Sequence, residues 1–465
     1  MPRTDTPHRA AVECTDNAGG CSVLDAPERP SASGIAHAAS PGRECEDSES
    51  APERLLRVKR FWTVTGSHVV VDIYPIFFAS LQIALADRLQ LTGTQIGIIY
   101  ASNQILSGLP QSLAAWLSDR HDTRIAGPLG LTLSCVCSCL IGFAPNFWVL
   151  WLLLSVAMVG NGIYHPIAGA QSGQLGRPLF KSGRAQAVSL FFAAGMVGSV
   201  IGPIASTRIN AEYGLPALAW LIPMGLLTAF ILHRVTGHIS HRSHQHSSVV
   251  ASMPPEEARV RWKAVWLLYA GNAIRFTVNT AMYVMFNIWA ARAIPDDPAA
   301  ATILNGKLVV AMTIGMGIGA IAAGRIVRPG YEVRAIVVLS ILGAVFTGLT
   351  SYAGHHWGMW PMYVCAALTS LGFSSILPIT IGLAQRLLPH RTGLASSLMM
   401  GGSWALAAVA PAVVGLFLGP PVAPASLDPA RLDMAFALFG VMLLAAGALA
   451  TAMPAAIIRK VSLTR

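Results

Sequence analysis

Long apolar blocks separated by short polar segments run along the chain from about residue 60 to its end. Each block has about 20 residues or more, and a helix of that length crosses the ~30 Å hydrocarbon core of a bilayer. The pattern therefore predicts an all-α membrane protein with twelve transmembrane helices. These predicted helices cover residues 60–86, 94–117, 125–144, 147–169, 185–207, 214–234, 263–291, 302–324, 333–353, 357–385, 391–418 and 433–455.

The composition supports this prediction. Only 12% of the 465 residues are charged and 54% are hydrophobic, whereas a soluble domain carries about 25% charged residues. The formal net charge of +10 would fit a nucleic-acid-binding protein, but the basic residues lie in short runs between the apolar blocks. We therefore expect a lipid bilayer around the chain and no nucleic-acid partner.

Basic residues are distributed unequally between the two sets of predicted loops. With the N-terminus in the cytoplasm, the outer loops hold mainly Arg88, Arg208, Arg292 and Arg431, and the inner loops hold far more. Loops rich in Lys and Arg stay on the cytoplasmic side. The sequence thus predicts a multi-pass protein of the inner (plasma) membrane with both termini in the cytoplasm.

Two segments lie outside the predicted helices. Residues 1–58 lack apolar periodicity and are expected to form a disordered cytoplasmic tail, with an over-long start annotation as the alternative. Residues 235–262 form the longest internal loop, which contains His238, His241, His244 and His246. A metal-sensing tract is one interpretation of these histidines, and we favour a solvated linker.

This linker divides the chain into two halves of six predicted helices, residues 59–234 and 263–465. A repeat supports the division, because SLFFAAGMVGSVIGP (189–203) aligns without gaps on SLMMGGSWALAAVAP (397–411). Two repeated halves are the layout of many secondary transporters, in which the substrate site lies near mid-membrane between them. Transport of a small molecule is therefore the leading hypothesis.

A histidine and an aspartate lie within the first predicted helix. A charge at mid-bilayer costs at least ~2.5–3.5 kcal/mol, so Asp72, about a dozen residues into its span, is a functional candidate. His68 lies one helical turn away on the same face. Pro75 removes one backbone hydrogen bond and should loosen the helix beside Asp72.

Arg275 lies at a matching depth in the seventh span and is the expected counter-charge of Asp72. It belongs to a polar stripe with helical spacing, and smaller polar groups occur in the second and fourth spans, where Pro166 should break the helix. A purely structural ion pair, a packed structural histidine and ordinary helix–helix hydrogen bonds remain alternatives. The candidates for substrate binding are Arg275, Asn272, Asn279, Gln104, Gln111 and Asn161, and His165 joins Asp72 and His68 as a candidate for proton coupling.

The segment WLSDRHDTR (116–124) resembles the loop signature of the major facilitator superfamily. Ala115 stands where that signature has its leading glycine, and Asp122 and Thr123 also depart from it. The resemblance implies that Asp119, with Arg120 and Arg124, locks one conformation. The equivalent second-half loop, GRIVRPGYEVR (324–334), lacks the aspartate, so we expect a weaker lock there.

A second motif, GSVIGP (198–203), resembles the fifth-helix mark of antiporters. Close helix packing around Gly198, Gly202 and Pro203 is its simpler interpretation. The fourth span lacks the arginine motif of typical drug–proton antiporters, which argues against their usual proton relay in this chain.

Within the superfamily, the chain looks most like the fosmidomycin-resistance branch. The motifs that carry this resemblance are SHVVVD (67–72), GNGIYHP (160–166), GRAQAVSLF (183–191), Arg275, and LAQRLLPHRTGLASSLMMG (383–401). Two departures bear on substrate and proton chemistry. Ile167 replaces a glutamate of the branch, and Pro75 comes earlier than the branch's first-helix proline.

These observations predict a secondary transporter that exports a drug or metabolite, in exchange for protons, as a monomer. Asp72 would gain and lose the proton, and Arg275 would hold either Asp72 or an anionic group of the substrate. An importer of an organic acid or sugar and a non-transporting scaffold or sensor are the alternatives. We find no nucleophile elbow or metal-ligand motif, so we expect no enzyme, no cofactor and no metal site.

Overall fold

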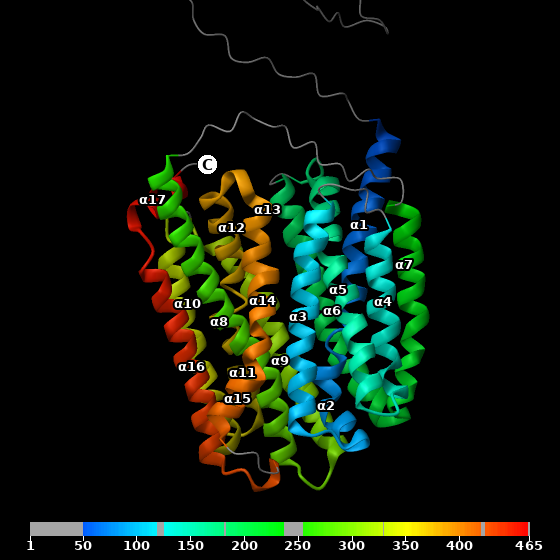
Figure 1. The fold of residues 1–465 in the computed structure, drawn as a ribbon. Helices are drawn as coiled ribbons and strands as arrows, with labels where there is room; N and C mark the ends of the chain where they lie inside the picture. The colour runs from blue at the N-terminus through cyan, green and yellow to red at the C-terminus, as the bar shows by residue number, and fades with distance from the viewer. Residues whose placement is uncertain are drawn as a thin grey trace, which may run out of the picture. The chain divides into compact units, whose positions relative to one another are not determined.

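The computed structural model describes residues 50–118, 125–180, 183–236, 254–328, 330–419 and 424–463, and no β-strand occurs among them. The chain divides into Met1–Ser50 and Ala51–Arg465, and the second unit is the helical bundle of Figure 1. Its first half contains α1 (Ala51–Ile73), α2 (Phe77–Leu89), α3 (Gly93–Ser118), α4 (Ala126–Leu140), α5 (Phe147–Gly176), α6 (Gly183–Tyr213) and α7 (Ile222–Thr236). Its second half contains α8 (Pro255–Ala293), α9 (Pro298–Ile326), α10 (Glu332–His356), α11 (Met359–Thr369), α12 (Leu377–Leu387), α13 (Thr392–Ser397), α14 (Ser403–Leu406), α15 (Ala410–Leu418), α16 (Pro429–Thr451) and α17 (Ala455–Leu463).

Ten helical segments of the described chain are long and apolar enough to cross a membrane. The all-α membrane fold is therefore confirmed, whereas the number of twelve spans stays a prediction. The other two predicted spans, 94–117 and 263–291, form α3 and α8. Both helices carry the polar stripes of the sequence, which lower their mean hydropathy. The ten segments are Ala51–Leu89, Ala126–Phe143, Phe147–Gly176, Gln186–Tyr213, Leu215–Thr236, Pro298–Ala323, Glu332–His356, Met359–Leu387, Gly393–Leu418 and Pro429–Thr451.

Pro75 and Pro166 affect their helices differently. The first predicted span breaks at Pro75, since α1 ends at Ile73 and α2 begins at Phe77. Pro75 has no N–H to continue the helical ladder, and the break directly follows Asp72. The predicted break at Pro166 is wrong, because α5 continues to Gly176. In a membrane bundle, neighbouring helices compensate for the lost backbone bond, and α5 packs along α3, α4 and α6.

Two predicted boundaries also need correction. Residues 51–58 of the predicted tail belong to α1, and residues 255–262 of the predicted linker belong to α8. Acidic residues in the first turn favour a helix start through the helix dipole, and both helices have them (Glu53 in α1, Glu256 and Glu257 in α8). Residues 1–49 and 237–253 lie outside the described residues.

The two halves contact each other through equivalent helices. Helix α6 of the first half packs on α9, and α3 packs on the segment from α13 to α15. The aligned repeat lies in α6 and in that segment, which contains a π-helical turn at Leu398–Gly402. The two copies of the repeat thus occupy equivalent positions in their halves, and each packs against a helix of the other half.

The apolar core is shared at one end of the bundle and divided at the other. We call these the α2 end, where α2 ends, and the α1 end, where α1 begins (Figure 1). One buried cluster joins first-half residues such as Phe77 and Leu81 to second-half residues such as Met285 and Leu308. Toward the α1 end, each half has a cluster of its own. The halves are therefore held together most firmly at the α2 end.

Buried hydrogen bonds add to this connection. Asn305 Nδ2 donates to the carbonyls of Ala79 (2.8 Å) and Ser80 (3.1 Å), and Asn287 Nδ2 donates to Ala79 O (3.0 Å). These carbonyls lie in α2, whose first turn follows the break at Pro75. The break thus places α2 where second-half side chains can bind its backbone.

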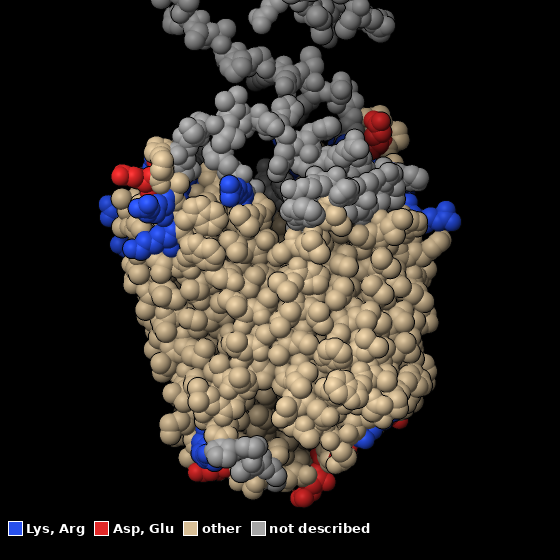
Figure 2. All heavy atoms as spheres, viewed as in Figure 1, with Lys and Arg blue, Asp and Glu red and all other residues tan. Residues whose placement is uncertain are grey.

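Charged side chains are absent from the middle of the face in Figure 2, and Lys and Arg gather mainly at its α1 end. An uncharged belt between charged ends is what a bilayer-spanning bundle requires. The α1 end is the one that the distribution of basic residues predicts to be cytoplasmic.

The second-half loop holds a carboxylate that the sequence reasoning missed. Glu332, at the start of α10, accepts from Arg386 Nη2 of α12 at 2.5 Å and from Gly330 N at 2.7 Å. Glu332 is only 4% exposed, and Arg261 of α8 donates to the carbonyls of Arg386 and Leu387. The expectation of a weaker lock in this loop did not consider Glu332. The loop signature of the superfamily has its aspartate at a position eight residues before Glu332.

Replacing Asn305 with Ala should loosen the α2 end, because two backbone carbonyls lose a buried donor. Each such hydrogen bond contributes about 0.5–1.5 kcal/mol, so the thermal unfolding midpoint in detergent should fall measurably. The half-buried Asn210 provides the control variant Asn210→Ala. Equal midpoints for the two variants would contradict the assigned role of Asn305.

Replacing Glu332 with Gln should destabilise the second half, because Arg386 loses the charged acceptor of its hydrogen bond. Hydrogen bonds to charged groups contribute about 1.5–3 kcal/mol, so chemical unfolding should begin at a lower denaturant concentration. Glu212→Gln, at an exposed acid of α6, should leave the curve unchanged. A wild-type curve for Glu332→Gln would show that this ion pair contributes little.

Candidate functional site

Asp72, His68 and His165 form a buried cluster, which we call the triad. His165 Nε2 lies 3.1 Å from Asp72 Oδ1, and His68 Nε2 lies 3.3 Å from Asp72 Oδ2. The residues come from α1 and α5, which pack against each other. Each carboxylate oxygen thus faces the Nε2 atom of a different histidine.

Backbone carbonyls fix both imidazole rings. His68 Nδ1 lies 2.6 Å from Phe191 O, and His165 Nδ1 lies 2.8 Å from Asn161 O. A carbonyl oxygen only accepts, so each Nδ1 must carry a hydrogen. Both neutral rings are therefore the Nδ1–H tautomer, and each presents the lone pair of Nε2 to Asp72.

This arrangement has room for added protons. A close contact between Nε2 and a carboxylate oxygen is a hydrogen bond only when a proton lies between the two atoms. The His165–Asp72 contact has hydrogen-bond geometry, whereas His68 Nε2 is buried without a hydrogen-bond partner among the described residues. The triad can thus share one proton between Asp72 and His165 and offers a second position at His68.

The triad is enclosed on one side and reaches the surface on the other. The His68 side chain is 1% exposed, and those of Asp72 and His165 are 11% and 17% exposed. The His68 ring stacks on Phe191 with centroids 3.8 Å apart. Access to the triad is therefore past His165 and Asp72, and His68 is the innermost group.

Three glycines of α6 let that helix approach α1 beside the triad. A Cβ on Gly198 would collide with Val69 O, and one on Gly202 would collide with Ile73 O. This geometry supports the helix-packing interpretation of the GSVIGP motif, in which Pro203 lies inside an unbroken α6. The sequence reasoning missed Gly195, where a Cβ would lie 2.5 Å from Asp72 Oδ2.

Arg275 does not pair with Asp72, so that prediction is wrong. Its guanidinium donates to Ala446 O (2.9 Å) and Ser340 Oγ (3.3 Å), and Nη1 lies 3.5 Å from Asn272 Oδ1. These partners lie on α16, α10 and α8, all in the second half. Matching depth in the membrane says nothing about the direction in which a side chain leaves its helix, which explains the error.

Arg275 is nevertheless an unusual cation. It is 3% exposed, the groups to which it donates are neutral, and its Nε has no partner among the described residues. Asn272 also donates to Thr380 Oγ1 at 2.9 Å. The proposed competition between Asp72 and substrate for Arg275 therefore has no support in this geometry, although an anionic group could still neutralise Arg275.

The other predicted substrate residues are spread over both halves. Asn279 Nδ2 lies 3.8 Å from Met316 Sδ, and a Cβ on Gly401 of the second half would lie 3.4 Å from Gln111 Oε1. Gln104 Oε1 and Asn161 Oδ1 are buried and have no hydrogen-bond partner among the described residues, and the same holds for Asn103 Oδ1, which the sequence reasoning missed. Asn161 alone joins the triad, through its carbonyl. Asp119, Arg120 and Arg124 lie outside the described residues.

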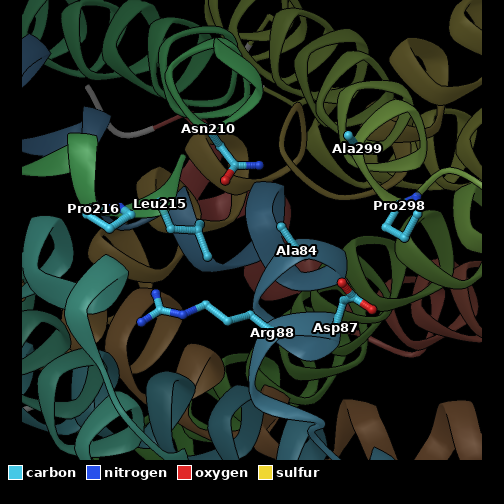
Figure 3. Close-up of a pocket in the computed structure, with 8 residues that line it drawn as sticks. All are labelled: Ala84, Asp87, Arg88, Asn210, Leu215, Pro216, Pro298 and Ala299. Carbon is cyan, nitrogen blue, oxygen red and sulfur yellow. The ribbon is translucent and has the colours of Figure 1, made fainter. Parts of the chain in front are cut away.

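A hollow of about 500 Å³ opens at the α2 end and is lined by Asp87, Arg88 and Asn210 among others (Figure 3). Arg88 donates to the carbonyls of Gly142 and Ala144, so its charge serves a structural contact there. The hollow contains none of the predicted site residues. It is a surface feature away from the triad.

Comparison with known proteins identifies the family. The sequence matches the Major Facilitator Superfamily over residues 69–412, which cover both halves of the bundle. The chain belongs to the major facilitator superfamily. Members of this superfamily carry small molecules across membranes, so the chain is a multi-pass membrane transporter without enzymatic activity.

The sequence is 25% identical to the fosmidomycin resistance protein of Escherichia coli (strain K12) over 361 residues, or 76% of this chain and 84% of the relative. It is 21% identical to the uncharacterized MFS-type transporter YfnC of Bacillus subtilis (strain 168) over 374 residues, or 79% and 88% of the two chains. The predicted resemblance to the fosmidomycin-resistance branch is thus confirmed at the level of sequence similarity.

Solved transporter structures share the fold. A bacterial homologue of the human drug peptide transporters PepT1 and PepT2 superimposes with a TM-score of 0.64 at 16% identity, covering 87% of this chain and 99% of that one. The D323A mutant of the nucleoside transporter NupG gives a TM-score of 0.62 at 12% identity, covering 86% and 99%. At such identities the likeness concerns the fold alone.

Replacing Gly195 with Ala should disturb the triad more than the fold. The added methyl would lie 2.5 Å from both Asp72 Oδ2 and His68 Cε1, and overpacking of this kind costs about 1–3 kcal/mol. We expect transport to be lost while the protein still elutes as a folded species in gel filtration.

Gly415→Ala is the matched control for this variant, because a Cβ at Gly415 would meet nothing within 4 Å. Gly415→Ala should keep both transport and stability. Full transport by Gly195→Ala would mean that the close approach of α6 does not fix the positions of Asp72 and His68.

Proposed function

We propose that this chain exports a small molecule across the inner membrane in exchange for protons, and that the triad is the proton-coupling site. The observation that carries the proposal is a buried carboxylate placed between two imidazoles whose other ring nitrogens are held by backbone carbonyls. Ionisable groups inside a membrane mark ion pathways far more often than structural sites. The similarity to the fosmidomycin resistance protein supports export as the direction.

Coupling would follow from the number of protons that the triad holds. With one proton the triad is neutral overall, and with two protons it carries one positive charge. Moving a net charge in or out of a buried site costs free energy unless another group compensates for it. A transporter that binds its substrate only in one of these states would exchange substrate for protons as its two halves alternate in access.

The remaining predicted residues have supporting roles in this proposal. Arg275, Asn272, Asn279, Gln104, Gln111 and Asn161 would bind substrate, with Arg275 offering the one buried cation among them. Asp119, Arg120 and Arg124 would lock one conformation at the cytoplasmic end, in a monomer whose termini both lie in the cytoplasm.

The proposal is tested by proton flux in inverted membrane vesicles that are energised to an acidic interior. Adding fosmidomycin as the first probe should release protons from vesicles containing the wild-type chain. Asp72→Asn should abolish this release, because an amide cannot take up a proton. Asp87→Asn, at the surface hollow, is the control that should behave as wild type.

Three outcomes would contradict parts of this proposal. Unchanged proton release in Asp72→Asn would exclude the triad as the coupling site. Protons that move in the same direction as the substrate would replace export by proton-coupled import. Retained biological function in neutral variants of both Asp72 and Arg275, with no flux in any of them, would indicate a non-transporting scaffold or sensor.

A further inference from the structure

The triad also has the properties of a metal site, although no ligand spacing in the sequence revealed one. The candidate ligand atoms are His68 Nε2, His165 Nε2 and a carboxylate oxygen of Asp72, and they lie within 4.8 Å of one another. We propose that the triad binds a divalent first-row transition-metal ion such as Zn²⁺ or Co²⁺ in place of its protons. This inference rests on the geometry of the triad and is independent of the proposed proton coupling.

The distances fit such an ion. Zinc binds histidine nitrogen and carboxylate oxygen at about 2.0–2.2 Å, so neighbouring ligand atoms of a tetrahedral site are about 3.3–3.5 Å apart. The two Nε2-to-oxygen distances are 3.3 and 3.1 Å. These distances go to different oxygens of Asp72, so one nitrogen–oxygen pair is already at the separation of two ligands on one metal, whichever oxygen binds. The three ligand atoms lie within 4.8 Å of one another, so the other two pairs would have to close by at most about 1.5 Å.

The surroundings of the imidazoles fit as well. A histidine ligand usually donates its other ring N–H to a carbonyl or carboxylate, which fixes the tautomer and aims the free lone pair at the metal. Phe191 O and Asn161 O accept from the Nδ1 atoms of His68 and His165 in this way. Neither Nε2 would have to break a bond to the backbone in order to bind a metal.

The contact of His68 Nε2 with Asp72 falls short of a well-formed hydrogen bond, which leaves this buried nitrogen open to a ligand. The His68 side chain is 1% exposed, and its Nε2 has no hydrogen-bond partner among the described residues. A buried polar atom without a well-formed hydrogen bond destabilises the fold. A metal ion bound by the two Nε2 atoms and one oxygen of Asp72 would give His68 Nε2 a full partner.

The ligand set selects the class of ion. Two imidazoles and one carboxylate suit Zn²⁺, Co²⁺ and Ni²⁺, whereas Mg²⁺ and Ca²⁺ require mostly oxygen ligands and Cu⁺ prefers thiolates. The exposed edges of His165 and Asp72 give the ion a route in and leave a fourth position for water or a substrate group. Because the metal ligands must be free of protons, ion binding and proton binding exclude each other.

The test uses the full-length transporter in detergent, purified without a polyhistidine tag and titrated with Co²⁺. Nitrogen and oxygen ligands in tetrahedral geometry give Co²⁺ an intense visible absorption band that the hydrated ion lacks. We expect this band in the wild type and in a background in which His238, His241, His244 and His246 are replaced by Gln, since the linker histidines could bind metal on their own.

Within that background, His68→Gln and His165→Gln should abolish the band, and Asp72→Asn should weaken Co²⁺ binding, because a neutral amide oxygen is a poorer ligand than a carboxylate. His355→Gln is the matched control. The Nδ1 atom of His355 lies 3.1 Å from Asp433 Oδ1, and this pair is not part of the triad. Absence of the band in the background, or its survival in His165→Gln, would overturn the proposal. His165, being partly exposed, decides the matter if His68→Gln does not fold.

The result is separable from the proposed transport. A Co²⁺ band that requires both histidines, together with proton flux that does not depend on Asp72, would leave the metal site standing and refute the coupling site. Flux that depends on Asp72 in a protein without the band would do the reverse. If both hold, Zn²⁺ should stop proton flux at concentrations that match its affinity for the triad.

Discussion

The cost of holding a carboxylate inside a membrane bundle governs the local structure around Asp72. The penalty for a charge at this depth is several kcal/mol, and the fold meets it with two imidazoles from different helices. That solution fixes much else. It requires α1 and α5 to run side by side, it requires two backbone carbonyls to hold the rings, and it requires α6 to lack side chains at Gly195 and Gly198, where any Cβ would strike the triad or its helix.

The sequence predicts the helices well and their contacts poorly. The apolar blocks locate almost every helix, because the hydrophobic requirement of the bilayer applies to each segment separately. The sequence also identifies His68, Asp72 and His165, because polar residues stand out within apolar segments. The pairing of Asp72 with His165 could not be predicted in the same way, because residues 93 positions apart meet only through the packing of α1 on α5.

A similar limit applies to two charged residues. Arg275 shares the depth of Asp72, but its side chain leaves α8 toward α10 and α16, and depth alone does not reveal that direction. Glu332 does not stand out in the sequence, because it lies away from the position of the motif's aspartate. What matters physically is a carboxylate within reach of Arg386, and a residue later in the loop can supply it.

The placement of the two buried charges bears on how any coupling must work. The triad lies wholly within the first half, and Arg275 and its partners lie wholly within the second. If the halves move as rigid bodies, that motion leaves the contacts of each charged group within its own half unchanged. What it can change is which side of the membrane reaches the exposed edges of His165 and Asp72. Coupling in this chain would therefore act through access to an intact triad and through the charge that the triad carries. It would not act through the exchange of partners by a single carboxylate.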